Sequence, residues 1–294
     1  MTKDLQIERN VCFSHDSDRV LTADVYSPAG GDEHPAVLML HGGGFESGSK
    51  EKYRRWGEFL AGLGYVAIAL NYRLATVQES IWPGVAEDVT AGVNWVVANA
   101  NRLRLDPMRL GLIGDSAGAH LAALHVLTHP VTPSHRIRAA VCVYGVFDLV
   151  EDELGSQSTS DLNRKMIGGS IETHRQSFEE ASPARWVDSA ASNINFDTRF
   201  LLIWGNSDQH VVPAQSENFA AQLESADIPV QTLSLTDVGH LWFNELPGLS
   251  DGSLDSYPND IVADRIAGFL GSEVMDSHSG NFSDRLVESL RPFA

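Results

Sequence analysis

The chain has 294 residues, and 43% of them are hydrophobic, which is enough for one large domain with a sizeable core. Its 21 lysine and arginine residues against 39 aspartate and glutamate residues give a formal net charge of −18. Because a chain this acidic repels phosphate backbones and anionic lipid surfaces, we expect no nucleic-acid partner and no membrane partner.

The N-terminal segment predicts a pair of antiparallel strands. Residues 5–13 and 20–26 alternate polar and apolar side chains, as strands with one exposed face do. The first twenty residues contain no continuous apolar run of the kind that a secretory signal needs, so we expect a cytoplasmic protein. The two cysteines, Cys12 and Cys142, are too few for a disulfide framework, and Cys142 lies in a predicted core strand.

After residue 35, apolar runs alternate with segments of helical period. The runs that predict buried strands lie at residues 36–40, 65–70, 110–113, 139–144, 200–204 and 230–235, and the predicted helices lie at 53–63, 85–99, 119–124, 213–225 and 258–270. Strands that alternate with helices need crossover connections. The pattern therefore predicts an α/β fold over residues 1–271, with a mostly parallel central sheet, an antiparallel N-terminal edge and helices on both faces.

Two segments depart from this alternation. Residues 147–195 are charged and serine-rich and contain no strand-like run, so they form either a lid over a site or an ordinary helical excursion. Residues 272–294 are polar but end in Phe282, Leu286 and Leu290 at helical spacing. This apolar stripe predicts packing on the body of the protein or on the neighbouring subunit of a homodimer.

The sequence Gly-Asp-Ser-Ala-Gly at residues 114–118 lies between a predicted buried strand and a predicted helix. A G-x-S-x-G sequence in this context predicts a nucleophile elbow, a sharp turn that exposes the Oγ of Ser116 at a helix N-terminus. The alternative is a serine that only caps the helix beginning at Ala117. We predict that Ser116 is a catalytic nucleophile.

A serine nucleophile needs a base to take its proton and an acid to orient that base. His240 follows the predicted strand at 230–235, and Asp208 follows the preceding strand, so the chain order is Ser, Asp, His. We therefore predict His240 as the base, with His210 as its rival. We predict Asp208 as the orienting acid, with Asp237 as the alternative.

The sequence His-Gly-Gly-Gly-Phe at residues 41–45 follows the predicted strand at 36–40. This position suits an oxyanion hole, and we expect the N–H groups of Gly43, Gly44 and Ala117 to form it. A glycine-rich turn can also bind phosphate, but neither G-K-[ST] nor G-x-G-x-x-G is present here. No clustered metal-ligand spacing occurs either, so we expect no metal and no cofactor.

Several side chains near these loops are candidates for contact with a substrate. Phe45, Tyr72, Phe147 and Trp242 could line an apolar pocket, although aromatic residues at such positions are equally often part of the core. Asp115, inside the elbow, could bind an alcohol group or cap the turn. Such a pocket would favour small to medium, mostly uncharged esters as substrates.

These motifs resemble those of α/β-hydrolases, and within them the HGGG-bearing carboxylesterases grouped with hormone-sensitive lipase. The sequences N-Y-R-L-A at 71–75, W-P-G-V-A-E-D-V at 82–89 and L-D-P at 105–107 are similar to that group. Only about 35 residues precede the strand before the glycines, and Ala119-His120 follows Gly118 in place of a second glycine. The sequences G-G-G-F-E-S-G-S-K at 42–50 and G-A-H-L-A at 118–122 are more similar to the feruloyl/acetyl-xylan-esterase and kynurenine-formamidase-like branch.

The resemblance implies a serine carboxylesterase that works through an acyl-enzyme and needs no cofactor. Two other functions stay open. An amidase, formamidase or small peptidase would use the same three residues. A catalytically inactive, ligand-binding hydrolase homologue is disfavoured because such proteins typically lose a triad member, whereas Ser116, Asp208 and His240 are all present.

Overall fold

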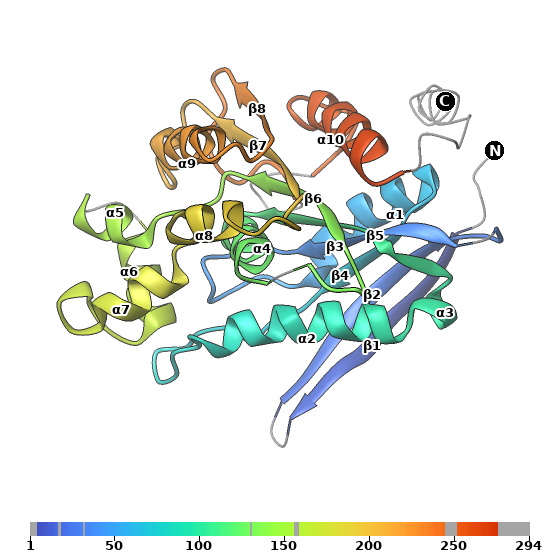
Figure 1. The fold of residues 1–294 in the computed structure, drawn as a ribbon, viewed down its shortest axis with the longest axis horizontal. Coiled ribbons are helices and arrows are strands. Elements are labelled where there is room, and N and C mark those ends of the chain that lie inside the picture. The colour runs from blue at the N-terminus through green and yellow to red at the C-terminus, as the bar shows by residue number, and fades with distance from the viewer. Residues whose placement is uncertain are drawn as a thin grey trace.

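The computed structural model describes residues 5–16, 19–31, 33–129, 131–155, 159–244 and 252–275. One eight-stranded sheet runs through this part of the chain, in the order β1-β2-β4-β3-β5-β6-β7-β8 (Figure 1). The strands are β1 (Leu5–Asp16), β2 (Arg19–Pro28), β3 (His34–Leu40), β4 (Val66–Leu70), β5 (Leu105–Asp115), β6 (Ile137–Val143), β7 (Arg199–Gly205) and β8 (Val230–Leu235).

The sheet has the predicted mixture of strand directions. β1 pairs antiparallel with β2, and β2 pairs antiparallel with β4. Every other neighbouring pair, from β4 and β3 across to β7 and β8, is parallel. The predicted α/β fold class, with an antiparallel N-terminal edge on a mostly parallel sheet, is therefore confirmed.

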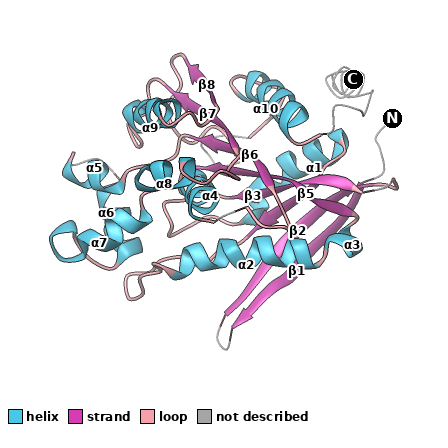
Figure 2. Cartoon of the chain, viewed as in Figure 1, coloured by secondary structure: helices cyan, strands magenta, loops and turns pink. Residues whose placement is uncertain are grey.

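Helices cover both faces of the sheet (Figure 2). The first face carries α1 and α10, which contact β4 and β6 respectively, and the second face carries α2, α4 and α9. The bounds are η1 (Lys50–Tyr53), α1 (Arg54–Leu63), α2 (Gly84–Ala98), α3 (Ala100–Leu103), α4 (Ala117–Thr128), α9 (Pro213–Ser225) and α10 (Asn259–Glu273). None of the helices in the described ranges combines the length and the apolar character required to cross a bilayer.

The parallel strands decide where a site can form. The loops after β3, β5, β7 and β8 carry the glycine-rich sequence, Ser116, Asp208 and His240 respectively. Because the carboxyl ends of parallel strands meet at one edge of a sheet, these four loops lie at the same edge. β3 and β5 occupy the middle of the strand order, so the loop with Ser116 lies near the centre of that edge.

Residues 147–195 form a helical insertion between β6 and β7, and we call it the insertion below. Its elements are α5 (Leu149–Leu154), α6 (Ser160–Ile167), α7 (Ile171–Ala181), the 3-10 helix η2 (Pro183–Trp186) and α8 (Val187–Ala191). Asp148 caps α5, because its Oδ1 accepts the N–H groups of Val150 and Glu151. No strand occurs among the described residues of the insertion.

Element boundaries differ from the prediction where the sequence pattern is weak. β5 begins at Leu105 instead of residue 110. The sequence pattern missed this start because residues 106–109 are only half-buried and form no apolar run. The short helix α3 was not predicted. α10 begins after Pro258 and continues to Glu273, past the predicted end. The predicted apolar stripe of Phe282, Leu286 and Leu290 lies outside the described residues.

Three histidines are buried inside this fold and are neutral as a consequence. Burial lowers the pKa of His41 and of His120 to about 4. In α4, burial and the nearby charges of His129 and His135 lower the pKa of His125 from 6.5 to about 3. Removing these groups from water disfavours the protonated form, so folding opposes their protonation.

We predict that His125 contributes to loss of stability in acid. Between pH 6.5 and about 3 the unfolded chain binds a proton at this residue and the folded chain does not. The titration of His125 should therefore lower the free energy of unfolding by about 1.4 kcal/mol for each pH unit below 6.5. His125→Leu should lose this part of the dependence of unfolding free energy on pH. Urea unfolding at several pH values measures that dependence.

The matched control is His15→Leu, because His15 is exposed on β1 and meets much the same solvent in the folded and unfolded chains. Its slope against pH should match that of the wild type. Parallel curves for wild type and His125→Leu would contradict the prediction.

Candidate active site

Ser116 lies on a strained turn between β5 and α4. Its backbone has φ +50° and ψ −117°, which non-glycine residues rarely adopt, and its N–H donates to the carbonyl of Val143 at 2.9 Å. A Cβ on Gly114 would strike the backbone of Gly118, and a Cβ on Gly118 would strike the carbonyl of Leu40. The two glycines are therefore required for this close approach of the strand, the helix and the neighbouring loop.

The structure brings the three predicted catalytic side chains together. The Nδ1 of His240 lies 2.6 Å from Oδ2 of Asp208, and its Nε2 lies 3.1 Å from Oγ of Ser116. A carboxylate only accepts hydrogen bonds, so Nδ1 carries the proton and Nε2 is left to accept the hydroxyl of Ser116. This arrangement can transfer the hydroxyl proton to the imidazole, as a nucleophilic serine requires.

Asp208 is held rigidly beside the histidine. Its side chain is fully buried, and its Oδ1 accepts the N–H groups of His210 at 2.9 Å and Val211 at 3.0 Å. The rival residues occupy other places. His210 is exposed, with its ring centroid 5.6 Å from that of His240, and the side chain of Asp237 is also exposed.

Tyr144 is a site residue that the sequence analysis missed. It follows β6 with φ +40°, and its ring centroid lies 4.3 Å from that of His240. Its N–H donates to the carbonyl of Ile203 at 2.7 Å, and burial raises the pKa of its hydroxyl well above the usual value. A buried ring against the imidazole limits how the histidine can turn. In the sequence this tyrosine only extends an apolar strand, which gave no sign of its role.

The loop at residues 41–45 has the geometry of a turn that only glycine can make. Gly43 and Gly44 have φ values of +135° and +60°. The carbonyl of Gly43 accepts the N–H of Ser47 at 3.0 Å and its hydroxyl at 2.9 Å, and a Cβ on Gly43 would strike that residue. Among the described residues, no acceptor binds the N–H groups of Gly43 and Gly44.

The glycine loop lies directly beside the elbow. Leu40 and Gly114 are partners in the pairing of β3 with β5, so the two loops leave the sheet from adjacent positions. A Cβ on Gly118 would also meet the carbonyl of His41 at 2.8 Å, so the backbones of the loop and of α4 are in contact. The N–H of Ala117 is the first in α4 and lies at this junction.

Asp115 joins several of these segments. Its buried Oδ1 accepts the N–H of Gly42 at 2.8 Å, the hydroxyl of Tyr53 at 2.9 Å and the side-chain amide of Asn244 at 2.9 Å. The hydroxyl of Tyr144 lies 3.5 Å from Oδ2. Burial raises the pKa of this carboxyl, and the hydrogen bonds from Tyr53 and Gly42 partly offset the rise. The observed partners of the carboxylate are thus protein groups beneath the site.

The four aromatic candidates are packed side chains, each 7% exposed or less. The hydroxyl of Tyr72 donates to the carbonyl of His41 at 2.5 Å. Phe147 stacks on a phenylalanine of α9, with centroids 4.3 Å apart, so it belongs to the core. Phe45, with φ +63°, packs edge-on against His120, and Trp242 packs edge-on against the ring of Tyr144.

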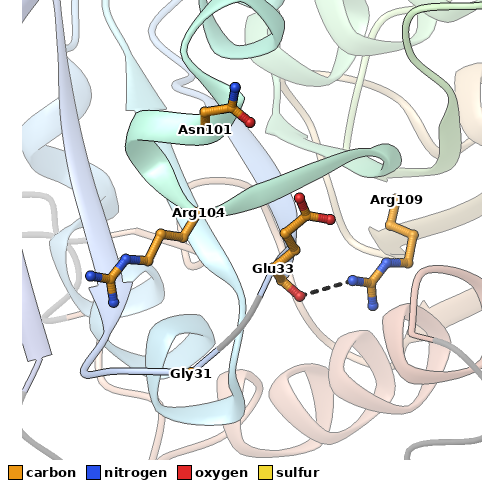
Figure 3. Close-up of a pocket in the computed structure, with 5 residues that line it drawn as sticks. All are labelled: Gly31, Glu33, Asn101, Arg104 and Arg109. Carbon is orange, nitrogen blue, oxygen red and sulfur yellow. Dashed lines mark hydrogen bonds between the residues drawn. The ribbon is translucent and has the colours of Figure 1, made fainter.

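A hollow of about 560 Å³ lies at the opposite edge of the sheet (Figure 3). Its lining comes from the segment before β3, from α3 and from the start of β5. In Figure 3, the side chain of Arg104 points away from Glu33, whereas Arg109 donates to the carbonyl of Glu33 at 2.9 Å. This hollow is separate from the loops that carry Ser116. Across the described residues, no three His, Cys, Asp or Glu side chains gather in a way that could hold a metal ion.

A family model described as BD-FAE matches residues 23–223, which is more than half of the chain. LipM of Mycobacterium tuberculosis, described as a probable carboxylic ester hydrolase, is 29% identical over 201 residues, covering 64% of this chain and 44% of LipM. Esterase LipC of the same bacterium is 28% identical over 251 residues, covering 80% of this chain and 58% of LipC. The chain thus spans about half the length of these curated relatives.

The fold is shared with solved esterases. A thermophilic esterase from Thermogutta terrifontis superposes with a TM-score of 0.72 at 22% identity, covering 95% of each chain. This likeness shows a common fold for the two proteins.

We predict that Asp115→Ala disrupts the site and the fold together. The change leaves buried N–H and O–H donors of Gly42, Tyr53 and Asn244 without an acceptor, and each costs about 1–3 kcal/mol. We expect the free energy of unfolding to fall by roughly 3 kcal/mol or more. Labelling of Ser116 by a fluorophosphonate should slow at least about tenfold, because a misaligned site that raises the activation free energy by about 1.4 kcal/mol gives that factor.

Asp115→Asn should lose much less on both measurements, because its amide oxygen can still accept these donors. The control is Asp264→Ala on the exposed side of α10, which should behave like the wild type. Wild-type labelling and stability in Asp115→Ala would contradict the role assigned to this carboxylate.

Proposed function

Since the chain belongs to the BD-FAE family of α/β-hydrolases, we propose that it is a serine carboxylic-ester hydrolase with Ser116, His240 and Asp208 as its catalytic triad. The observation that carries this proposal is the pair of hydrogen bonds that link the three side chains, 2.6 Å and 3.1 Å long. They occur at a partly buried serine whose backbone is strained into a sharp turn between a strand and a helix, which is the geometry of a nucleophile elbow.

In the first half of the reaction, Oγ of Ser116 attacks the ester carbonyl while Nε2 of His240 takes the hydroxyl proton. Asp208 keeps the imidazole in the tautomer that can accept this proton and stabilises the positive charge that forms. When the tetrahedral intermediate collapses, the bond to the leaving oxygen breaks and His240 returns the proton to the alcohol. The acyl group stays on Ser116 as an ester.

In the second half, water attacks the acyl-enzyme and His240 takes one of its protons. Collapse of the second tetrahedral intermediate releases the carboxylic acid and returns the proton to Oγ of Ser116. Both intermediates carry negative charge on the former carbonyl oxygen. We assign the N–H groups of Gly43, Gly44 and Ala117 to hold that charge, because the glycine loop is in contact with the first turn of α4. Each such donor is worth about 10²-fold or more in rate.

The proposed substrates are small to medium, mostly uncharged esters. The relatives LipM and LipC are themselves described as a carboxylic ester hydrolase and an esterase. The Thermogutta terrifontis esterase has been solved with butyrate bound and with propionate bound, both short carboxylates. The buried aromatic side chains around the triad favour an apolar acyl group over a charged one.

We predict that Ser116→Ala abolishes hydrolysis of p-nitrophenyl acetate and butyrate. Loss of the nucleophile should lower kcat/KM by at least about 10³-fold, because catalysis then rests on the oxyanion donors and on binding alone. The measurement is initial rates of p-nitrophenol release with purified protein. Matching p-nitroanilide substrates, assayed side by side, separate an esterase from an amidase that uses the same residues.

The matched control is Ser225→Ala, at the exposed end of α9, which should keep wild-type rates. Retained turnover in Ser116→Ala would refute the proposed nucleophile. Faster cleavage of anilides than of esters by the wild type would reassign the enzyme to amide hydrolysis.

A further inference from the structure

The helix α6 of the insertion packs on the glycine loop. A Cβ on Gly44 would lie 2.6 Å from Cδ1 and 3.2 Å from Cδ2 of Leu162, so this leucine fills the space directly beside that glycine. One turn further along α6, Lys165 forms an ion pair with Glu46, which lies two residues after Gly44. Leu162 itself is only partly buried, so part of its side chain borders open space.

Backbone contacts fix α6 against the segment before α2. The carbonyl of Met166 accepts the N–H of Ile81 at 3.0 Å and the N–H of Trp82 at 3.1 Å. These are main-chain contacts between two parts of the chain that are far apart in sequence. They hold the end of α6 in one position relative to the sheet.

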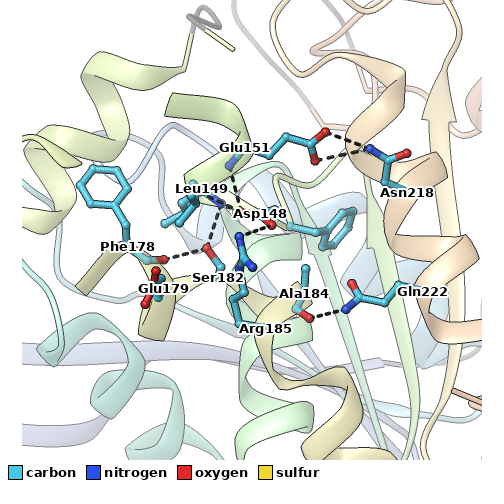
Figure 4. A network of polar contacts seen from close by, with 12 residues as sticks. Asp148, Leu149, Glu151, Phe178, Glu179, Ser182, Ala184, Arg185, Asn218 and Gln222 are labelled. Carbon is cyan, nitrogen blue, oxygen red and sulfur yellow. Dashed lines mark hydrogen bonds and ion pairs between the residues drawn. The ribbon is translucent and has the colours of Figure 1, made fainter. Parts of the chain in front are cut away.

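The base of the insertion is clamped to α9 (Figure 4). Oε1 of Gln215 accepts the N–H groups of Phe147 and Asp148 at 2.8 and 2.9 Å, where the insertion begins. Nε2 of Gln222 donates to the carbonyl of Ala184 at 2.8 Å, in the last third of the insertion. In Figure 4, Asp148 and Arg185 also point toward each other, with an ion pair of 3.1 Å.

The two ends of the insertion are also tied to each other. Oγ of Ser182 accepts the N–H of Leu149 at 2.9 Å and donates to the carbonyl of Phe178 at 2.7 Å. With these contacts near both ends and with α6 docked on the glycine loop, the described helices of the insertion form a roof over that loop. We call it the roof below.

The strand order separates the loop beside Leu162 from the loop that carries His240. The leaving oxygen must stay within reach of Nε2 of His240, which comes from the loop after β8. The glycine loop comes from β3, on the other side of β5 in the strand order. Leu162 packs on that loop, so it is next to the segment assigned to the carbonyl oxygen and not next to the loop that receives the leaving alcohol. Of the two parts of the ester, the acyl part is the one that extends away from His240.

We propose that Leu162 closes the acyl end of the site and restricts the enzyme to short acyl chains. This inference rests on the proposed esterase function and adds a residue that selects the substrate. A leucine held against Gly44 by a roof that is anchored on three sides occupies the volume that further methylene groups of a longer acyl chain would need. The alcohol part of the ester is not limited by this residue.

The test compares Leu162→Ala with the wild type on two series of esters. In the first series the alcohol is p-nitrophenol and the acyl chain grows from acetate to octanoate. In the second series the acyl group is acetate and the alcohol grows from ethanol to hexanol, followed by pH-stat titration. We expect the octanoate-to-acetate ratio of kcat/KM to rise at least about tenfold in Leu162→Ala, since one methylene group in a hydrophobic pocket changes kcat/KM by about that factor or more.

The hexyl-to-ethyl ratio in the second series should stay as in the wild type. Leu162→Phe gives the opposite test, because a larger side chain should lower the butyrate-to-acetate ratio, and it covers the case in which Leu162→Ala does not fold. Leu154→Ala is the matched control, since Leu154 ends α5 and is 66% exposed. It should leave both series unchanged.

The outcomes separate the two proposals. If the wild type is an active esterase and both Leu162 variants keep its acyl-chain profile, the inference about Leu162 is overturned and the esterase proposal stands. A change in the alcohol series in place of the acyl series also overturns it. If the folded wild type hydrolyses none of these esters, the esterase proposal fails and this inference fails with it.

Discussion

The buried carboxylate of Asp115 is the contact on which the geometry of the site depends. The elbow can present Ser116 by itself, but the neighbouring loops come from other strands and need a common reference point. Asp115 supplies it, because one oxygen binds Gly42, before the two glycines proposed for the oxyanion hole, and Asn244, after the proposed base His240. A carboxylate in such a place is costly to bury, and the N–H and O–H donors around it offset that cost. The acid next to the nucleophile therefore aligns the segments on both sides of it.

The site is assembled at two scales. Parallel pairing of β3, β5, β6, β7 and β8 brings four distant loops to one edge of the sheet. Individual hydrogen bonds and ring contacts then align the side chains within those loops, as the ring of Tyr144 does for the imidazole of His240. The fold brings the loops together, and a few buried polar and aromatic side chains align the residues within them.

The fold class was predictable because apolar strands and helical periods are local signals. The turn at Ser116 was predictable for the same reason, since its strand, glycines and helix lie within one short stretch. Asp208 and His240 were predicted from the strands that precede them and from their order after Ser116. The contacts of Tyr144 with His240 and of Leu162 with Gly44 were not predictable, because each joins segments far apart in sequence. Phe147 was a candidate for a substrate pocket because it follows a strand near the predicted site along the chain. Its ring stacks on α9 in the core instead.

The clamp between the insertion and α9 has a consequence for divergence within the family. Gln215 and Gln222 hold the insertion mainly through main-chain groups, namely the amides of Phe147 and Asp148 and the carbonyl of Ala184. Main-chain groups are present whatever side chain stands at those positions. A change of side chain at these positions therefore leaves the main-chain part of the clamp in place. In the proposed enzyme, substrate range and bond cleavage depend on different parts of the chain, so the first can change while the second is kept.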